Sequence, residues 1–136
     1  MREPPPSELN ARRFFQLLQE KSLDGLRDFL HEEVVFRPRI MQARLFHGRD
    51  EVMRLFYDDV FGWPLYEPVA HTYTPVTDEL VVVDGQVRWI RKGRLHDTPT
   101  VWLLEFKDNK LFRLEAPASK AEALSQASAR AANSSA

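Results

Sequence analysis

The order of the hydrophobic periods along the chain constrains its fold more than any other feature. Up to about residue 62, apolar residues recur three and four positions apart, as on one face of a helix. After Pro64, apolar, β-branched and aromatic residues come in short runs separated by polar turns, which is typical of strands. Helices that precede a block of strands predict an α+β fold, with the helices packed on one face of a curved, mainly antiparallel sheet.

Three helices are expected, over residues 7–21, 22–33 and 48–62. We expect Ser7 to cap the first helix and Asp24 the second, with His31–Glu33 at the end of the second. A first strand should follow over Val34–Pro38. Because side chains alternate along a strand, Val34, Phe36 and Pro38 should share one face and the two neighbouring arginines the other.

Six further strands are expected, over residues 65–69, 73–76, 80–83, 87–91, 100–106 and 111–115. Asp84-Gly85 and Asp108-Asn109 are typical of hairpin turns, and the last two strands should form one hairpin. We therefore expect an extended lead-in over residues 1–6 and one domain over 7–118. The Ala/Ser-rich tail over 119–136 should be partly helical or disordered.

The composition excludes several classes of function. The net charge of −1 offers nucleic acid or an anionic membrane no overall attraction, and no apolar run reaches the roughly 18 residues of a membrane span. The chain has no cysteine, which excludes disulfides, thiol catalysis and Cys-ligated zinc and fits a cytoplasmic location. The four histidines, at 31, 47, 71 and 96, lack metal-ligand spacing. We expect no metal, no cofactor, no nucleic-acid partner and no membrane partner.

Three stretches carry a family resemblance: "RRFFQLLQEKSLDGLRDFLHEEVVFRPR", "FHGRDEVMRLFYDDVF" and "VWLLEFKDNKLFRLEAPASKAEAL". They resemble the SnoaL-like branch of the NTF2-like superfamily, which includes ketosteroid isomerases, polyketide cyclases, scytalone dehydratase and limonene epoxide hydrolase. The resemblance spans about residues 9–125. It implies a cone-shaped, curved sheet wrapped around three N-terminal helices, with one open mouth. It does not imply one function, because this scaffold hosts many chemistries.

The catalytic positions of a ketosteroid isomerase can be carried over one at a time. The aspartate base, late in the first strand, corresponds to Pro38, and a one-residue shift would give a neighbouring arginine instead. The oxyanion tyrosine corresponds to Phe14, the second oxyanion donor to Trp102, and a supporting tyrosine to Phe56. The resemblance therefore places apolar residues in all four polar roles.

This substitution pattern predicts that the protein has no steroid isomerase activity. The reaction needs a base and hydrogen-bond donors aimed at the developing enolate, and neither is present at the corresponding positions. With a 3-keto-Δ5 steroid, isomerisation and proton exchange should both run at the background rate. A rate above background in either assay would overturn this prediction.

The resemblance instead implies an apolar pocket inside the cone, which favours a small hydrophobic ligand. The residues expected to line it are Phe14, Leu18, Phe36, Pro38, Phe56, Trp89, Trp102 and Leu104.

A few polar residues could carry a different chemistry. His71 and Tyr73 lie two apart and should share one face of a strand, and Arg91 should end the face that carries Trp89. His96-Asp97, in an expected loop, could form a general base near neutral pH. An ordinary structural role also explains each of these residues, and we prefer it.

The opposite face of the sheet should carry Leu103 together with Glu105, and its apolar residues predict a homodimer through the outer sheet face. Three hypotheses stay open. The protein binds a small ligand in an apolar cone; or it is a cyclase, dehydratase or hydrolase that uses the polar residues above; or its cone is filled and the dimer is structural.

Overall fold

The computed structural model describes residues 3–37, 45–60 and 65–134. Most of the helices come first along the chain, and the long strands follow. They are α1 (Pro6–Glu20), α2 (Leu23–Phe29), β1 (Leu30–Arg37), β2 (Phe46–His47), α3 (Arg49–Arg54), the π-helical η2 (Leu55–Val60), β3 (Leu65–Pro75), β4 (Leu80–Arg91), β5 (Arg94–Lys107), β6 (Lys110–Glu115) and α4 (Lys120–Ser134).

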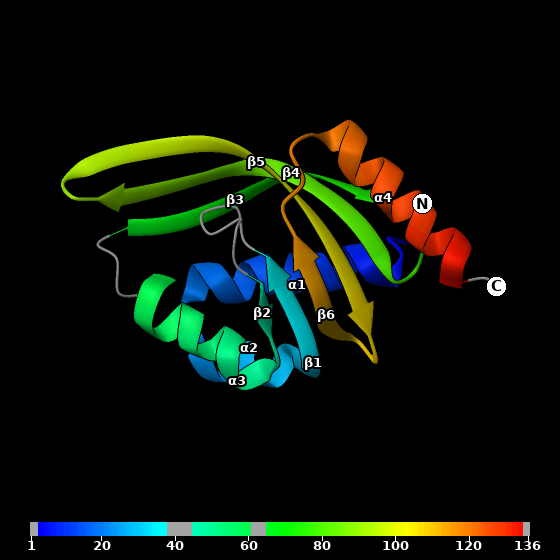
Figure 1. Ribbon diagram of the computed structural model, residues 1–136, viewed down its shortest axis with the longest axis horizontal. Helices are drawn as coiled ribbons and strands as arrows, with labels where there is room; N and C mark the ends of the chain where they lie inside the picture. Colours follow the sequence, from blue (N-terminus) through cyan, green and yellow to red (C-terminus); the bar gives the residue numbers. More distant parts are fainter. Residues whose placement is uncertain (1–2, 38–44, 61–64, 135–136) are drawn as a thin grey trace.

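The six strands form one curved sheet in the order β2-β1-β6-β5-β4-β3. Only the β1–β6 pair is parallel among the pairings of the described strands; the others are antiparallel. Figure 1 shows α1, α2 and α3 on the concave side, which we call the inner face, and α4 on the opposite, outer face. The predicted α+β fold, with a curved and mainly antiparallel sheet around N-terminal helices, is confirmed.

Two predicted helix caps are wrong. The N-cap of α1 is Pro5, and Ser7 lies inside the helix, where its buried hydroxyl donates to the Thr77 carbonyl at 2.7 Å. The N-cap of α2 is Ser22, whose hydroxyl accepts from the Gly25 N–H at 3.2 Å, so Asp24 falls in the first turn instead. Ser7 forms a tertiary hydrogen bond instead of a cap. Ser22 directly precedes the apolar run that starts at Leu23, so it caps α2 in place of Asp24.

Strand β1 starts earlier than predicted, because Leu30 already pairs with Leu111 of β6 and is fully buried. His31, Glu32 and Glu33 therefore belong to the strand and not to the end of a helix. The predicted alternation is confirmed where the strand is described: Val34 and Phe36 are buried, and Arg37 is exposed. Pro38 and Arg39 lie outside the described residues.

The Asp84-Gly85 turn predicted from the sequence does not exist, because β4 runs through it as one strand. Gly85 pairs with Ala70 and Thr100, next to a bulge in β3 between Ala70 and Thr72. A Cβ atom on Gly85 would lie 1.9 Å from the Val69 carbonyl oxygen. Glycine is needed here for close approach of two backbones and not for a turn.

Two other pairs make the tight turns. Asp108-Asn109, predicted as a hairpin turn, joins β5 to β6 with φ angles of 55° and 58°. Lys92-Gly93, in the basic stretch "RWIRKGR" that the sequence indicates as a solvated hairpin turn, joins β4 to β5 with φ angles of 53° and 75°. Paired left-handed residues suit the twist of a two-residue hairpin loop.

Helix α4 covers part of the outer face. Ser119 caps it by accepting from the Glu122 N–H at 3.1 Å. Its fully buried Ala123 and Ala127 pack with Leu103 and with Leu80 and Val82 of β4, and Arg130 pairs with Glu105. Leu103 and Glu105 do face outward as predicted, but this chain's own helix covers them. Among the helices that the structure describes, none is long and apolar enough to cross a bilayer.

Candidate functional site

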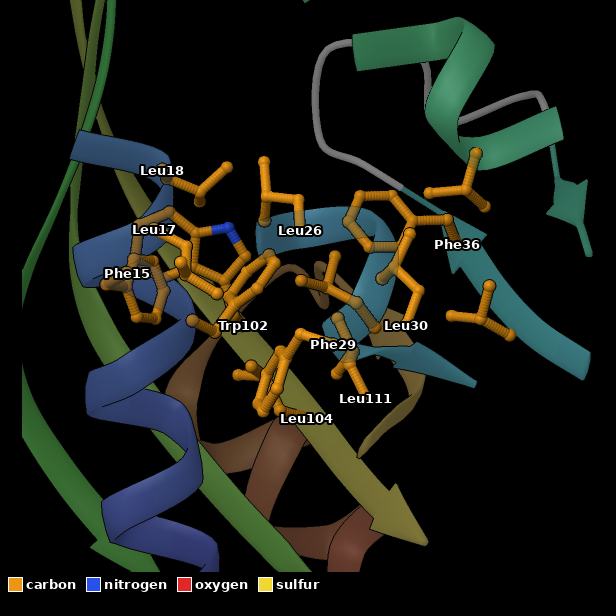
Figure 2. Close-up of a cluster of buried hydrophobic side chains, with 14 of the residues drawn as sticks. Phe15, Leu17, Leu18, Leu26, Phe29, Leu30, Phe36, Trp102, Leu104 and Leu111 are labelled. Carbon is orange, nitrogen blue, oxygen red and sulfur yellow. The ribbon is translucent and has the colours of Figure 1, made fainter. Parts of the chain in front are cut away.

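The residues predicted to line the cone come together on the inner face. Figure 2 shows how side chains from α1, α2, β1 and β5 converge there. Pro38 lies outside the described residues. Of the others, Trp89 is half-buried against the cluster, and six belong to it: Phe14, Leu18, Phe36, Phe56, Trp102 and Leu104.

One part of this cluster is solid, and we call it the closed part; it consists of Phe14, Phe29, Leu104, Phe106 and Leu111. Phe29 and Phe106 meet with ring centroids 6.0 Å apart, and Phe14 meets Phe36 edge-on at 6.4 Å. Each member is at most 6% exposed. Dense ring packing of this kind is typical of a hydrophobic core.

The inner face continues past Trp102 towards the tip of the β4–β5 hairpin, which extends beyond the helices (Figure 1). We call this stretch the open part; it consists of the half-buried Trp89, His96 and Thr98 together with the buried Val87 and Thr100 between them and Trp102. Successive cross-strand pairs place these residues on the same face as Trp102, because Val83 pairs with Trp102 and every second residue of β4 follows it.

An aromatic pair lies at the outer end of the open part. Trp89 and His96 are directly paired across β4 and β5, and their rings stack with centroids 4.0 Å apart at an angle of 14°. Both side chains are half-buried. A flat, half-exposed aromatic surface of this kind can pack against a planar apolar molecule.

The polar groups between this pair and Trp102 can offer a ligand few hydrogen bonds. Thr100 is 3% exposed, and its hydroxyl donates to the Thr98 carbonyl at 3.0 Å, so its donor is used locally. Thr98 is half-buried on the same face. The open part can therefore orient a ligand through a hydroxyl or an imidazole, but its area is mainly apolar.

His71 and Tyr73 do not form a joint site. The bulge in β3 interrupts the alternation on which their pairing depended, and His71 is exposed. Tyr73 packs edge-on against Phe15 at 6.4 Å, with the Arg12 guanidinium 4.2 Å from its ring centroid. Burial raises the pKa of the Tyr73 phenol above its ordinary value, and the Arg12 charge opposes that rise only in part. The phenol is therefore neutral near pH 7.

The sequence predicted a loop at His96 and Asp97, but both residues lie within β5. Neighbouring residues of a strand point to opposite faces, so His96 stacks on Trp89 while Asp97 is exposed on the outer face, opposite Arg88. The predicted general-base pair is therefore not assembled. Arg91 pairs with Arg94 through its backbone, and its side chain lies outside the described part of the structure.

A hollow that the sequence did not indicate lies on the surface where α2, β1, β2 and α3 meet and has a volume of about 920 Å³. Exposed ion pairs cross it, with Arg27 3.1 Å from Asp50 and Arg49 3.3 Å from Glu32. Its charges are balanced within the chain, and no group of three metal-ligating side chains occurs in the described segments. Its lining residues are Arg27, Glu32, Phe46, His47, Gly48, Arg49, Asp50, Glu51, Arg54 and Leu55.

The family follows from a match to the sequence model of the SnoaL-like domain, which covers residues 11–114. The chain belongs to the SnoaL-like family. The matched segment runs from Ala11, inside α1, to Leu114, near the end of β6, so it contains most of the inner face just described, whereas α4 lies outside it. A search of curated proteins finds no match to this SnoaL-like domain.

Solved structures share the fold at low identity. RV0760c from Mycobacterium tuberculosis, in complex with estradiol-17beta-hemisuccinate, is 9% identical with a TM-score of 0.75, over 87% of this chain and 97% of that one. An NTF2-like protein of unknown function from Burkholderia pseudomallei is 20% identical (TM-score 0.72; 91% and 98% covered). A putative SnoaL-like polyketide cyclase from Shewanella putrefaciens is 16% identical (TM-score 0.71; 94% and 99% covered). TerC, co-crystallised with polyporic acid, is 14% identical (TM-score 0.70; 90% and 97% covered).

Proposed function

We propose that this SnoaL-like domain binds a small, largely hydrophobic molecule on the open part of its inner face. One observation carries the proposal: the apolar layer of Leu18, Phe36, Phe56 and Trp102 continues without a break into the half-buried Trp89–His96 stack. The closed part supplies a rigid base for that surface. Preformed apolar sites with few polar groups are typical of small-molecule binding.

The shape of the open part favours a flat ligand with few polar atoms. The Trp89–His96 stack offers an aromatic surface, and Thr98 and His96 offer single hydrogen bonds. Two structures of similar fold, solved with estradiol-17beta-hemisuccinate and with polyporic acid, support a ring-containing ligand. We further propose a cytoplasmic location, which the absence of cysteine supports.

Enzymatic activity of another kind is the second candidate. His96 is the observation in its favour, because an imidazole beside an apolar surface can transfer a proton near neutral pH. His71, Tyr73 and Asp97 lie elsewhere, so such a cyclase, dehydratase or hydrolase would rely on His96 alone among the described candidates. Loss of turnover, but not of binding, in His96→Phe would establish it.

Filling the open part should abolish binding. Thr98→Trp places an indole on the inner face, whereas Asp97→Trp places the same ring on the outer face of the same strand. Ligands from an aromatic, terpenoid and polyketide-like panel should raise the melting temperature of the wild-type and Asp97→Trp proteins and leave Thr98→Trp unchanged. At 100 times the Kd, binding adds about 2.7 kcal/mol to the free energy of unfolding. Equal shifts in both variants would place the site elsewhere.

We also propose that the protein is a homodimer through the outer sheet face. Since α4 covers Leu80, Val82 and Leu103, the interface would use the part of that face between α4 and the tip of the β4–β5 hairpin. Sedimentation should show a species of about twice the 15.9 kDa chain mass at micromolar concentration. A 15.9 kDa species alone would remove the dimer.

A further inference from the structure

We infer that the ligand of the open part is an acid: a flat apolar body that carries one carboxylate, which Arg94 binds beyond the Trp89–His96 stack. The inference rests on the proposed function and names the chemical class of its ligand.

Arg94 lies at the outer end of the inner face. Strand β5 begins at this residue, and Arg94 shares a face with His96 and Thr98, because residues two apart on a strand point the same way. The Cα atoms of Arg94 and His96 are therefore about 7 Å apart. An extended arginine side chain has a similar length, so its guanidinium can reach the edge of the Trp89–His96 stack.

The guanidinium of Arg94 is available to a ligand. Arg94 is exposed, and none of the ion pairs within the described residues involves it. The described inner-face residues that β4 and β5 contribute to this stretch include no carboxylate; they are Val87, Trp89, Arg94, His96, Thr98 and Thr100. Neither strand therefore supplies a counter-charge to Arg94 on its own face.

The acids nearest to this stretch in the sheet lie on the outer face. Glu67 of β3 and Asp97 of β5 both pair in register with Arg88 of β4, and all three alternate with inward residues. The alternation therefore separates the charges across the sheet, with Glu67 and Asp97 outside and Arg94 inside. An anion on the inner face is attracted by the near cation, while the thickness of the sheet separates it from the two acids.

A molecule that fits both features is an aromatic or polycyclic carboxylic acid. Its flat body packs on the Trp89–His96 stack, and its carboxylate accepts two parallel N–H bonds from the planar guanidinium of Arg94. The imidazole of His96 has an N–H to donate in either of its protonation states. An uncharged molecule of the same shape keeps the contact with the rings but loses the charge-assisted bonds. Discrimination between the two is therefore the signature of this arrangement.

Two probes of one shape test the inference. The probes 2-naphthoate and 2-naphthamide share a ring system and differ in charge. Isothermal titration calorimetry at neutral pH and low ionic strength should show that wild type binds the acid at least about fivefold more tightly than the amide. The preference should shrink at high salt, because Arg94 is exposed and its attraction is screened there.

Variants separate the charge from the aromatic surface. Arg94→Gln should bring the two affinities to within about twofold of each other, and Arg94→Lys should keep part of the preference. Arg54→Gln removes the same charge at an exposed position of α3 and should keep the full preference. Trp89→Leu should weaken both probes by a similar factor, since both use the stack. Circular dichroism should match wild type in each variant.

The outcomes for this inference and for the proposed function are distinct. Equal affinities of wild type for the two probes, or a preference that survives in Arg94→Gln, would overturn the inference and leave the proposed function standing. A preference lost in Arg54→Gln would place the acid in the hollow at α3 and would also overturn it. The same holds if neither probe binds while neutral compounds of the thermal-shift panel do. A wild type that binds no compound of the panel would overturn both.

Discussion

Trp102→Asp should lower the melting temperature by at least about 10 °C. Trp102 is 5% exposed on the inner face and packs against Phe15 with ring centroids 4.9 Å apart (Figure 2). The substitution removes a large buried ring, which costs about 3–5 kcal/mol, and strands a carboxylate among apolar side chains. A chain of this size has only about 5–15 kcal/mol of stability in total, so partial unfolding near room temperature is the expected outcome.

Two companion variants show whether burial at this position is the cause. Trp102→Phe keeps a ring on the inner face and should cost far less than the aspartate. Pro99→Asp adds the same charge at an exposed position of the same strand and should be nearly neutral. Differential scanning calorimetry on the three variants measures the contrast. A thermally neutral Trp102→Asp would show that the register of β5 is wrong.

Gly85→Ala should be the most damaging single-methyl change in the sheet. The added Cβ would lie 1.9 Å from the Val69 carbonyl oxygen and 3.0 Å from the Ala70 Cα, both of them backbone atoms that cannot rotate away. β3 would have to separate from β4 at the bulge, with loss of ladder hydrogen bonds on either side. We expect a loss of about 3 kcal/mol or more in the free energy of unfolding by denaturant titration.

Gly93→Ala is the matched control for Gly85→Ala. Gly93 has a φ angle of 75°, and a Cβ there would meet no atom within 4 Å. Its cost is therefore the left-handed backbone alone, about 1–2 kcal/mol, and Gly93→Asn should recover part of it. Equal losses at the two glycines would contradict the account of Gly85 as a point of backbone contact.

Local patterns were sufficient to predict the layers of the fold. Val34 and Phe36 alternate with Arg37 on β1 as expected, and Val52, Leu55 and Phe56 form the buried side of α3 and η2 at helical spacing. These residues obey a period because each faces either the core or solvent. The Asp108-Asn109 turn was also predictable, because two adjacent left-handed residues favour this dipeptide.

Contacts between distant segments could not be predicted in the same way. Asp84-Gly85 is typical of a turn by composition, but the bulge in β3 decides its role, and nothing near residue 85 encodes that bulge. The turn at Lys92-Gly93 sets the length of β4 and β5, and with it moves His96 from an expected loop onto the inner face. At Asp84-Gly85, tertiary pairing overrides the local preference for a turn.

The candidate site shows the same difference between what local patterns predict and what depends on contacts between distant segments. The resemblance predicted that Phe14, Phe56 and Trp102 lie together, and all three belong to the buried cluster on the inner face. It could not say which inner-face residues are fully buried and which are half-buried, because that depends on how rings from four elements fit together. The separation into a closed and an open part, and the Trp89–His96 stack, became visible only in three dimensions.

The central claim is that ligand binds on the open part of the inner face. The most direct test follows the indole N–H resonances of Trp89 and Trp102 by nitrogen-edited NMR while a panel compound that raises the melting temperature is titrated in. Both resonances should shift with the same Kd. The amide resonance of Gly48, in the hollow where α2, β1, β2 and α3 meet, should not shift. Shifts confined to Gly48 and its neighbours, with both indoles unchanged, would contradict the claim.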